Sequence, residues 1–252
     1  MTKHLALIAA AAAALVSQSA VAALAAGDIS FTALNADEDG WALVTFVDIA
    51  ANTKIYFTDN EWNGSAFNSG ESYHQWVSGS ATIAAGTVIR FSKIDTTSLA
   101  ASAGTLSRAA VSGSTNYGLN QDEDSIYAYT ASSATGTPSF LAAITTTAFG
   151  TAAAGTLTNT GLSVGNGAIA LGGGAEWEQY IGDRSGQASL AAYKPLVGNI
   201  ANWTNNPNNG SYASQLPNTT AFSVTAVPEP ESYALMLTGL LAVGAVARRR
   251  RG

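Results

Sequence analysis

Two short acidic turns offer the oxygen ligands that a hard cation prefers. Asp37 and Asp39 belong to the turn at 37–40, and Asp122 and Asp124 belong to the turn at 122–124. Ca²⁺ takes about six to eight oxygen ligands, many of them carboxylates on loops. Neither turn has the distal glutamate of a twelve-residue calcium loop, and solvated hairpin tips are also acidic. We expect no cofactor apart from Ca²⁺, for which the candidate ligands are Asp37, Asp39, Asp122 and Asp124.

A second group of carboxylates lies among aromatic residues. Asp59, Glu61 and Glu71 are close in sequence to four rings, those of Trp62, Tyr73, His74 and Trp76. Two carboxylates on opposite sides of a sugar can act as acid and base in glycoside hydrolysis. Aromatic faces can also stack on sugar rings, a role open to Trp177, Tyr180 and Trp203 as well. Large rings are more often buried, so a structural role is the simpler interpretation.

Other catalytic chemistry has little support in the sequence. The absence of Cys excludes thiolate nucleophiles and thiolate metal sites. Ser72 and His74 lie two residues apart without the glycine pattern of a nucleophile elbow. A lone His with carboxylates is a poor zinc set, and the glycines at 172–174 lack the Lys-Ser of a phosphate loop. We therefore predict no catalytic residues and a protein that is not an enzyme.

These residues must be positioned by an all-β fold. Of 252 residues, 47% are hydrophobic and only 11% are charged, which is atypical of disordered or long helical chains. Short runs of β-branched and aromatic residues are bounded by Gly, Asn or Asp, at 42–47, 54–58, 87–91, 125–129, 140–145, 168–171 and 221–224. This pattern predicts an immunoglobulin-like or Greek-key β-sandwich in one domain, residues 27–226, with helices only at the two termini.

Both ends of the chain look like processing segments. Residues 1–26 combine Lys3, an apolar run and small residues, as a signal peptide does, so signal peptidase is an expected partner. Near the other end, Pro228, Glu229 and Pro230 precede an apolar stretch at 232–247. At about 1.5 Å per residue this stretch would form a short transmembrane helix. The terminal basic tail would remain in the cytoplasm; it consists of Arg248, Arg249, Arg250 and Arg251.

The carboxyl-terminal arrangement resembles the PEP-CTERM sorting signal of Gram-negative bacteria that make exopolysaccharide. Residues 227–252 contain all three parts in order, namely the motif at 228–230, the helix at 232–247 and the basic tail at 248–251. The resemblance implies processing by an exosortase near the motif. It also implies association with exopolysaccharide or biofilm. An ordinary membrane anchor, which also pairs an apolar helix with basic flanks, is the alternative.

A second resemblance covers residues 28–145. The run from Thr53 to Trp62, with Ile55-Tyr56-Phe57-Thr58-Asp59-Asn60 at its centre, resembles a domain of exported bacterial proteins and, more distantly, the lamin-tail sandwich. This resemblance implies a β-sandwich and an extracellular context, and it brings no catalytic residues.

The acidic charge of the mature domain limits its partners and is compatible with cations or neutral glycans. Residues 27–227 contain six basic and fifteen acidic residues, a net charge of −9, which disfavours nucleic acid as a partner. We expect a chain that is exported, held transiently in the inner membrane, and then placed at the cell surface or in the extracellular matrix. A glycan- or calcium-binding adhesion module is one alternative, and a secreted hydrolase is another.

Overall fold

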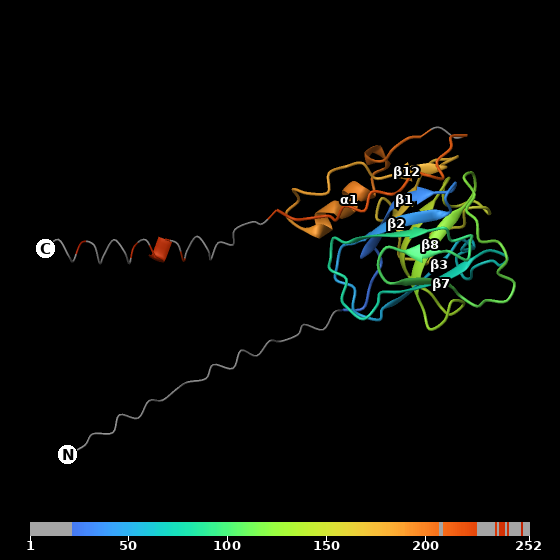
Figure 1. Ribbon diagram of the computed structural model, residues 1–252, viewed down its shortest axis with the longest axis horizontal. Helices are drawn as coiled ribbons and strands as arrows, with labels where there is room; N and C mark the ends of the chain where they lie inside the picture. The colour runs from blue at the N-terminus through green and yellow to red at the C-terminus, as the bar shows by residue number, and fades with distance from the viewer. Residues whose placement is uncertain are drawn as a thin grey trace, which may run out of the picture.

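The computed structural model describes residues 22–206 and 209–225, together with the separate positions 235, 237–239, 241 and 248. Its strands form two sheets, which confirms the predicted all-β sandwich (Figure 1). The first sheet is antiparallel and has the order β12 (Trp177–Gln179), β1 (Ile29–Asn35), β2 (Gly40–Thr45), β5 (Val88–Ser92) and β6 (Ala100–Ala101).

The second sheet contains the other seven strands. Its order is β10 (Ser163–Val164), β11 (Gly167–Ala170), β9 (Ser139–Thr145), β8 (Ser125–Thr130), β3 (Lys54–Thr58), β4 (Tyr73–Val77) and β7 (Thr105–Arg108). From β9 to β7 all pairs are antiparallel, whereas β10, β11 and β9 run parallel. Strands formed after residue 146 therefore join both sheets, since β11 extends the second and β12 the first.

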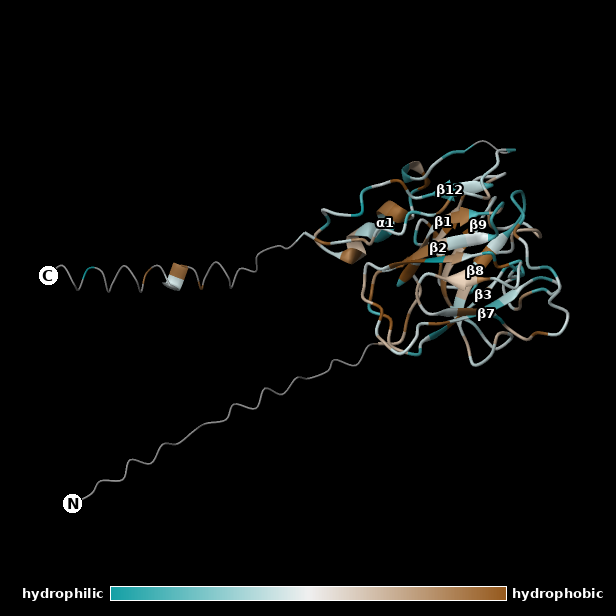
Figure 2. Cartoon of the chain, in the orientation of Figure 1, coloured by the Kyte–Doolittle hydropathy of each residue, from teal (hydrophilic) through white to brown (hydrophobic). Residues whose placement is uncertain are grey.

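The hydrophobic side chains of the domain form two clusters, a main core and a second cluster. Successive side chains of a strand point to opposite faces of the sheet. Accordingly, Ile55 and Phe57 of β3 belong to the main core, whereas Tyr56 between them belongs to a second cluster. On β8, Ile126 lies in the main core and Tyr127 in the second cluster. Figure 2 shows apolar colour on the central strands and polar colour on much of the loop surface.

The carboxyl-terminal part of the domain contains short helical turns and ends against the main core. The turns are η1 (Leu190–Tyr193), α1 (Lys194–Val197) and η2 (Ile200–Asn202), which lie inside a region expected to lack helix. After them, Phe222 is buried against the rings of Phe46, Tyr180 and Tyr193. The Arg184 guanidinium donates hydrogen bonds to the carbonyls of Asn218 and Thr220, at 3.0 and 2.9 Å.

Six of the seven predicted strand segments are present with small shifts, and the seventh is wrong. Residues 221–224 form only a single bridge, Gln187 to Val224, because Phe222 enters the core and its neighbours bond to separate loops. The signal helix at 1–26 reaches into the described residues only at 22–26, which have no regular structure, and the helix at 232–247 lies largely outside them. Within the described part of the chain, no helix is long and apolar enough to cross a membrane.

Candidate functional site

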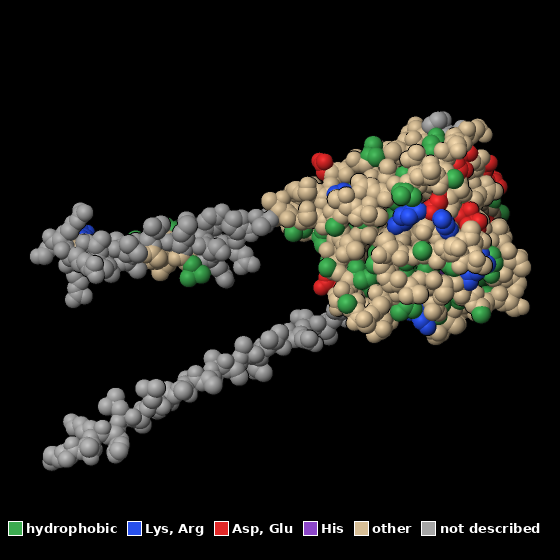
Figure 3. Space-filling view, viewed as in Figure 1, with side chains coloured by type: hydrophobic (Ala, Val, Ile, Leu, Met, Phe, Trp, Pro, Cys, Tyr) green, Lys and Arg blue, Asp and Glu red, His purple; other side chains and the backbone are tan. Residues whose placement is uncertain are grey.

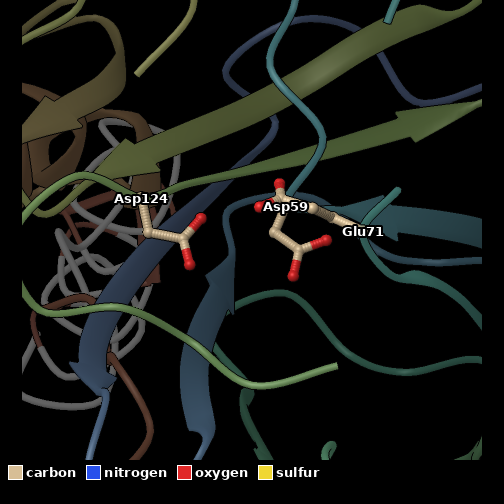
Figure 4. Close-up of side chains that lie close together, drawn as sticks. All are labelled: Asp59, Glu71 and Asp124. Atoms are coloured by element: carbon tan, nitrogen blue, oxygen red, sulfur yellow. The ribbon is translucent and has the colours of Figure 1, made fainter. Parts of the chain in front are cut away.

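Three carboxylates meet at one end of three adjacent strands. Asp59 directly follows β3, Glu71 lies two residues before β4, and Asp124 directly precedes β8. Because β3 pairs antiparallel with both β4 and β8, the end of β3 lies beside the beginnings of the other two strands. Figure 4 shows the Asp124 carboxylate facing the other two side chains. We call Asp59, Glu71 and Asp124 the carboxylate cluster.

The cluster is tight and largely buried. One ligand oxygen from each residue lies within 4.8 Å of the other two, and Asp59 and Asp124 are only 2% and 6% exposed. The Oδ1 atom of Asp59 accepts hydrogen bonds from the Ser72 backbone N–H and hydroxyl, both at 2.7 Å. The Asp124 carboxylate accepts hydrogen bonds from the backbone N–H groups of Ser125 and Asn120, at 2.7 and 2.8 Å. These bonds fix the orientation of both carboxylates.

Two oxygens of the cluster lack a partner. Asp59 Oδ2 and Glu71 Oε2 are shielded from solvent and have no hydrogen-bond partner within the described part of the chain. Unpaired buried carboxylate oxygens are costly, because a carboxylate loses its hydration on burial. Each oxygen has lone pairs available to a proton or a cation.

The electrostatics of the cluster favour an added positive charge. Burial raises the pKa of Asp59 to about 7, and repulsion from Glu71 adds to this effect. Burial likewise raises the pKa of Glu71 to about 7, and burial with repulsion from Asp59 places the pKa of Asp124 well above its usual range. The ion pairs found between described residues are Arg90 with Glu38 and Lys194 with Asp28, so neither reaches the cluster.

The structure separates the predicted calcium ligands. Asp124 alone joins the carboxylate cluster, with Asp59 and Glu71, which the sequence suggested only as acid–base residues. Asp37 Oδ2 accepts a hydrogen bond from the Tyr212 N–H at 2.6 Å, and Asp39 Oδ1 accepts one from the Leu119 N–H at 2.6 Å. Asp122 is exposed.

No space for a substrate is found on the side of Asp59 that faces the main core. Beside Asp59, the void lined by Trp41, Phe57 and His74 does not admit a water-sized sphere. The nearest oxygens of the three carboxylates lie within 4.8 Å of one another, which is shorter than the roughly 6.5–9.5 Å separation of the carboxyl groups in inverting glycosidases. Ser72 donates to Asp59, and His74 Nε2 lies 3.3 Å from the Ile94 carbonyl, so Ser72 and His74 form no nucleophile–base pair.

A pocket of about 410 Å³ lies over the second cluster. Its apolar floor includes Trp62, Phe67 and Tyr73, and its neutral polar rim includes Asn68 and Thr137. Phe67 is half-buried and contacts five other rings, those of Trp62, Tyr73, Tyr127, Tyr129 and Phe140. No charged residue lines this pocket. Figure 3 shows where charged side chains gather on one face of the domain, with uncharged groups covering much of the rest of that face.

The aromatic residues suggested by the sequence as sugar-stacking groups lie in two different places. Trp62 and Tyr73 line it, whereas Trp76, Trp177, Tyr180 and Trp203 are buried in the main core. Phe67 could not be singled out from its local sequence, because the turn around Asn63 and the bridge between Trp62 and Phe67 bring that ring back over the sheet.

Comparison with known proteins concerns the carboxyl-terminal end. The family model of the PEP-CTERM protein-sorting motif matches residues 226–251. The chain carries a PEP-CTERM sorting motif. It is thus an exported protein that is sorted at the membrane through exosortase processing. No curated protein and no solved structure matches the chain.

The PEP-CTERM motif begins directly after the last described residue of the domain, Thr225. Pro228, Glu229 and Pro230 lie outside the described residues, as do Arg249, Arg250 and Arg251, whereas Arg248 is exposed. The Thr225 N–H donates a 2.9 Å hydrogen bond to the Gln187 carbonyl. The folded domain and the PEP-CTERM motif are therefore adjacent, with no linker domain between them.

Proposed function

We propose that this exported chain is a non-enzymatic protein of the cell surface or extracellular matrix whose domain binds neutral glycan of the exopolysaccharide or biofilm. The observation that carries this proposal is the uncharged aromatic pocket around Phe67. Sorting by exosortase delivers the domain to the outside, and the pocket gives it a surface for the polysaccharide found there.

The chemistry of the pocket suits a sugar. Its volume of about 410 Å³ lies within the roughly 300–1,000 Å³ typical of ligand pockets. A pyranose ring has apolar C–H faces that stack on aromatic rings and hydroxyl edges that hydrogen-bond to amides and hydroxyls. Phe67 supplies a partly accessible ring, and Thr135 and Thr137 supply exposed hydroxyl groups. The absence of charge in the lining favours neutral over acidic sugars.

Two features support a binding role over hydrolysis. The aromatic pocket has no Asp, Glu or His in its lining. Within the described residues, three carboxylates come together in the carboxylate cluster. None of its members lines the aromatic pocket. Bound glycan would therefore meet no acid–base pair.

Affinity electrophoresis of the full-length chain in mild detergent tests the proposal. We expect gels containing a neutral polysaccharide, such as dextran, or neutral exopolysaccharide from a producing host to retard the wild type. Acidic alginate should not retard it, because residues 27–227 carry a net charge of −9. Phe67→Ala should weaken retardation at least tenfold, since it removes the accessible ring.

Phe149→Ala is the matched control. Phe149 is also half-buried and contacts Tyr127 of the second cluster, but it does not line the pocket. Its substitution should leave retardation within twofold of the wild type. No retardation by any neutral polysaccharide, or an equal loss in both variants, would refute glycan binding at this pocket. Release of reducing sugar by the wild type would refute the non-enzymatic assignment.

A further inference from the structure

We propose that Asp59, Glu71 and Asp124 form a Ca²⁺-binding site. Three strand ends bring their carboxylates together, and the Asp59 side chain, one of the three, is 2% exposed and has no hydrogen-bond partner for its Oδ2 atom. That oxygen is an independent indication of a ligand, because the other oxygen of Asp59 is fully engaged with Ser72.

The size of the cluster fits Ca²⁺. Calcium–oxygen distances are about 2.3–2.6 Å, so two ligand oxygens on one ion lie at most about 4.6–5.2 Å apart. The three oxygens fall within 4.8 Å of one another. Mg²⁺ binds at about 2.0–2.1 Å, demands near-ideal octahedral geometry and usually keeps several of its waters, so it is less suited to ligands held by fixed strand ends. A donor set made only of oxygens also disfavours Zn²⁺, which prefers nitrogen and sulfur.

The ligands are held in place before an ion binds. Ser72 fixes Asp59, and the backbone N–H groups of Asn120 and Ser125 fix Asp124. The remaining unpaired oxygens, Asp59 Oδ2 and Glu71 Oε2, are free to coordinate. Glu71 is only half-buried, so water from that side can complete the coordination shell.

Ca²⁺ at this position would clamp a loop. Asp59 and Glu71 lie at the two ends of residues 59–71, and Asp124 anchors them to β8. Within the loop, Asn68 N–H bonds to the Glu61 carbonyl at 3.0 Å and Trp62 bridges to Phe67. An ion joining the loop ends should therefore slow opening of residues 60–70. This effect does not depend on the glycan proposal, although the same loop contributes to that pocket.

Calcium titration of the full-length chain in mild detergent tests the site. After EDTA treatment and buffer exchange at pH 7.5, we expect Ca²⁺ to raise Tm by several degrees with a Kd of about 10⁻⁴–10⁻³ M, the range of extracellular modules. Amide hydrogen exchange in residues 60–70 should slow at least threefold. Mg²⁺ at the same concentration should have a smaller effect on both Tm and amide hydrogen exchange.

Variants distinguish the carboxylate cluster from the acidic turns. Asp59→Asn and Glu71→Gln should each weaken Ca²⁺ binding at least tenfold, whereas Asp122→Asn, which removes an exposed carboxylate two residues from Asp124, should change it less than twofold. If Asp59→Asn does not fold, Glu71→Gln decides, because its side chain is half-buried. No response to 10 mM Ca²⁺, or a loss caused by Asp122→Asn and not by Glu71→Gln, would overturn the proposal.

Discussion

Replacing Phe222 with Ala should detach the carboxyl-terminal segment of the domain. Phe222 is 3% exposed, and its ring centroid lies 5.0 Å from that of Tyr193 and 5.7 Å from that of Tyr180. The Arg184 guanidinium lies 5.0 Å from the same ring. Truncating such a buried Phe costs about 3–5 kcal/mol in transfer and cavity terms. We expect about 3 kcal/mol here, because a segment near the end of the domain can partly close the cavity.

Urea denaturation of the full-length chain in detergent, followed by tryptophan fluorescence, measures this loss. Hydrogen exchange supplies a local readout, since the Ser223 and Thr225 N–H groups bond to the carbonyls of Arg184 and Gln187. Both amides should lose protection in Phe222→Ala. Phe149→Ala, which truncates a half-buried ring, should cost about 1 kcal/mol and leave these amides protected. A loss below 1 kcal/mol with unchanged protection would refute the anchoring role of Phe222.

Two further predictions concern a buried imidazole and a close approach of two backbones. Burial lowers the pKa of His74 to about 4, whereas the unfolded chain takes up a proton near pH 6.5, so stability should fall as the pH drops through this window. Urea titrations measure the free energy of unfolding, which should fall between pH 7 and pH 4 by roughly 3 kcal/mol more in the wild type than in His74→Gln. Equal falls in the two proteins would contradict this prediction. Gly86 has φ +89°, and a Cβ there would lie 2.2 Å from the Phe222 carbonyl oxygen, whereas Gly79 has φ +92° and open space. Gly86→Ala should therefore lower Tm more than Gly79→Ala, which reports backbone strain alone; equal shifts would argue against contact with Phe222.

The sequence predicted strands well where the local pattern was strong. Residues 54–58 alternate β-branched and aromatic side chains, and β3 spans those same residues. By contrast, β4 was not predicted, because the polar residues His74 and Gln75 interrupt its apolar pattern. Residues 221–224 show the opposite error: their composition predicts a strand, but Phe222 instead packs its ring into the main core.

The candidate sites depended on contacts that the sequence does not encode locally. Asp59 and Glu71 could be named from their chemistry, but their meeting with Asp124 requires β8 to pair with β3 across an interval of more than sixty residues. Periodicity reveals a strand and not its neighbour in the sheet. Phe67 is a second example, because the turn around Asn63 and the bridge to Trp62 bring its ring to the second cluster.

The anchored end of the domain limits how far the folded body can stand from the sorting motif. Thr225 is still hydrogen-bonded to Gln187, and Pro228 follows three residues later. Even a fully extended chain covers only about 3.3–3.6 Å per residue, so the connection from Thr225 to Pro228 is at most about 10 Å long. An exosortase that acts at the motif must therefore work within about 10 Å of the last hydrogen-bonded residue of the domain. Cleavage at the motif would therefore leave only a few residues beyond the last hydrogen-bonded residue of the domain.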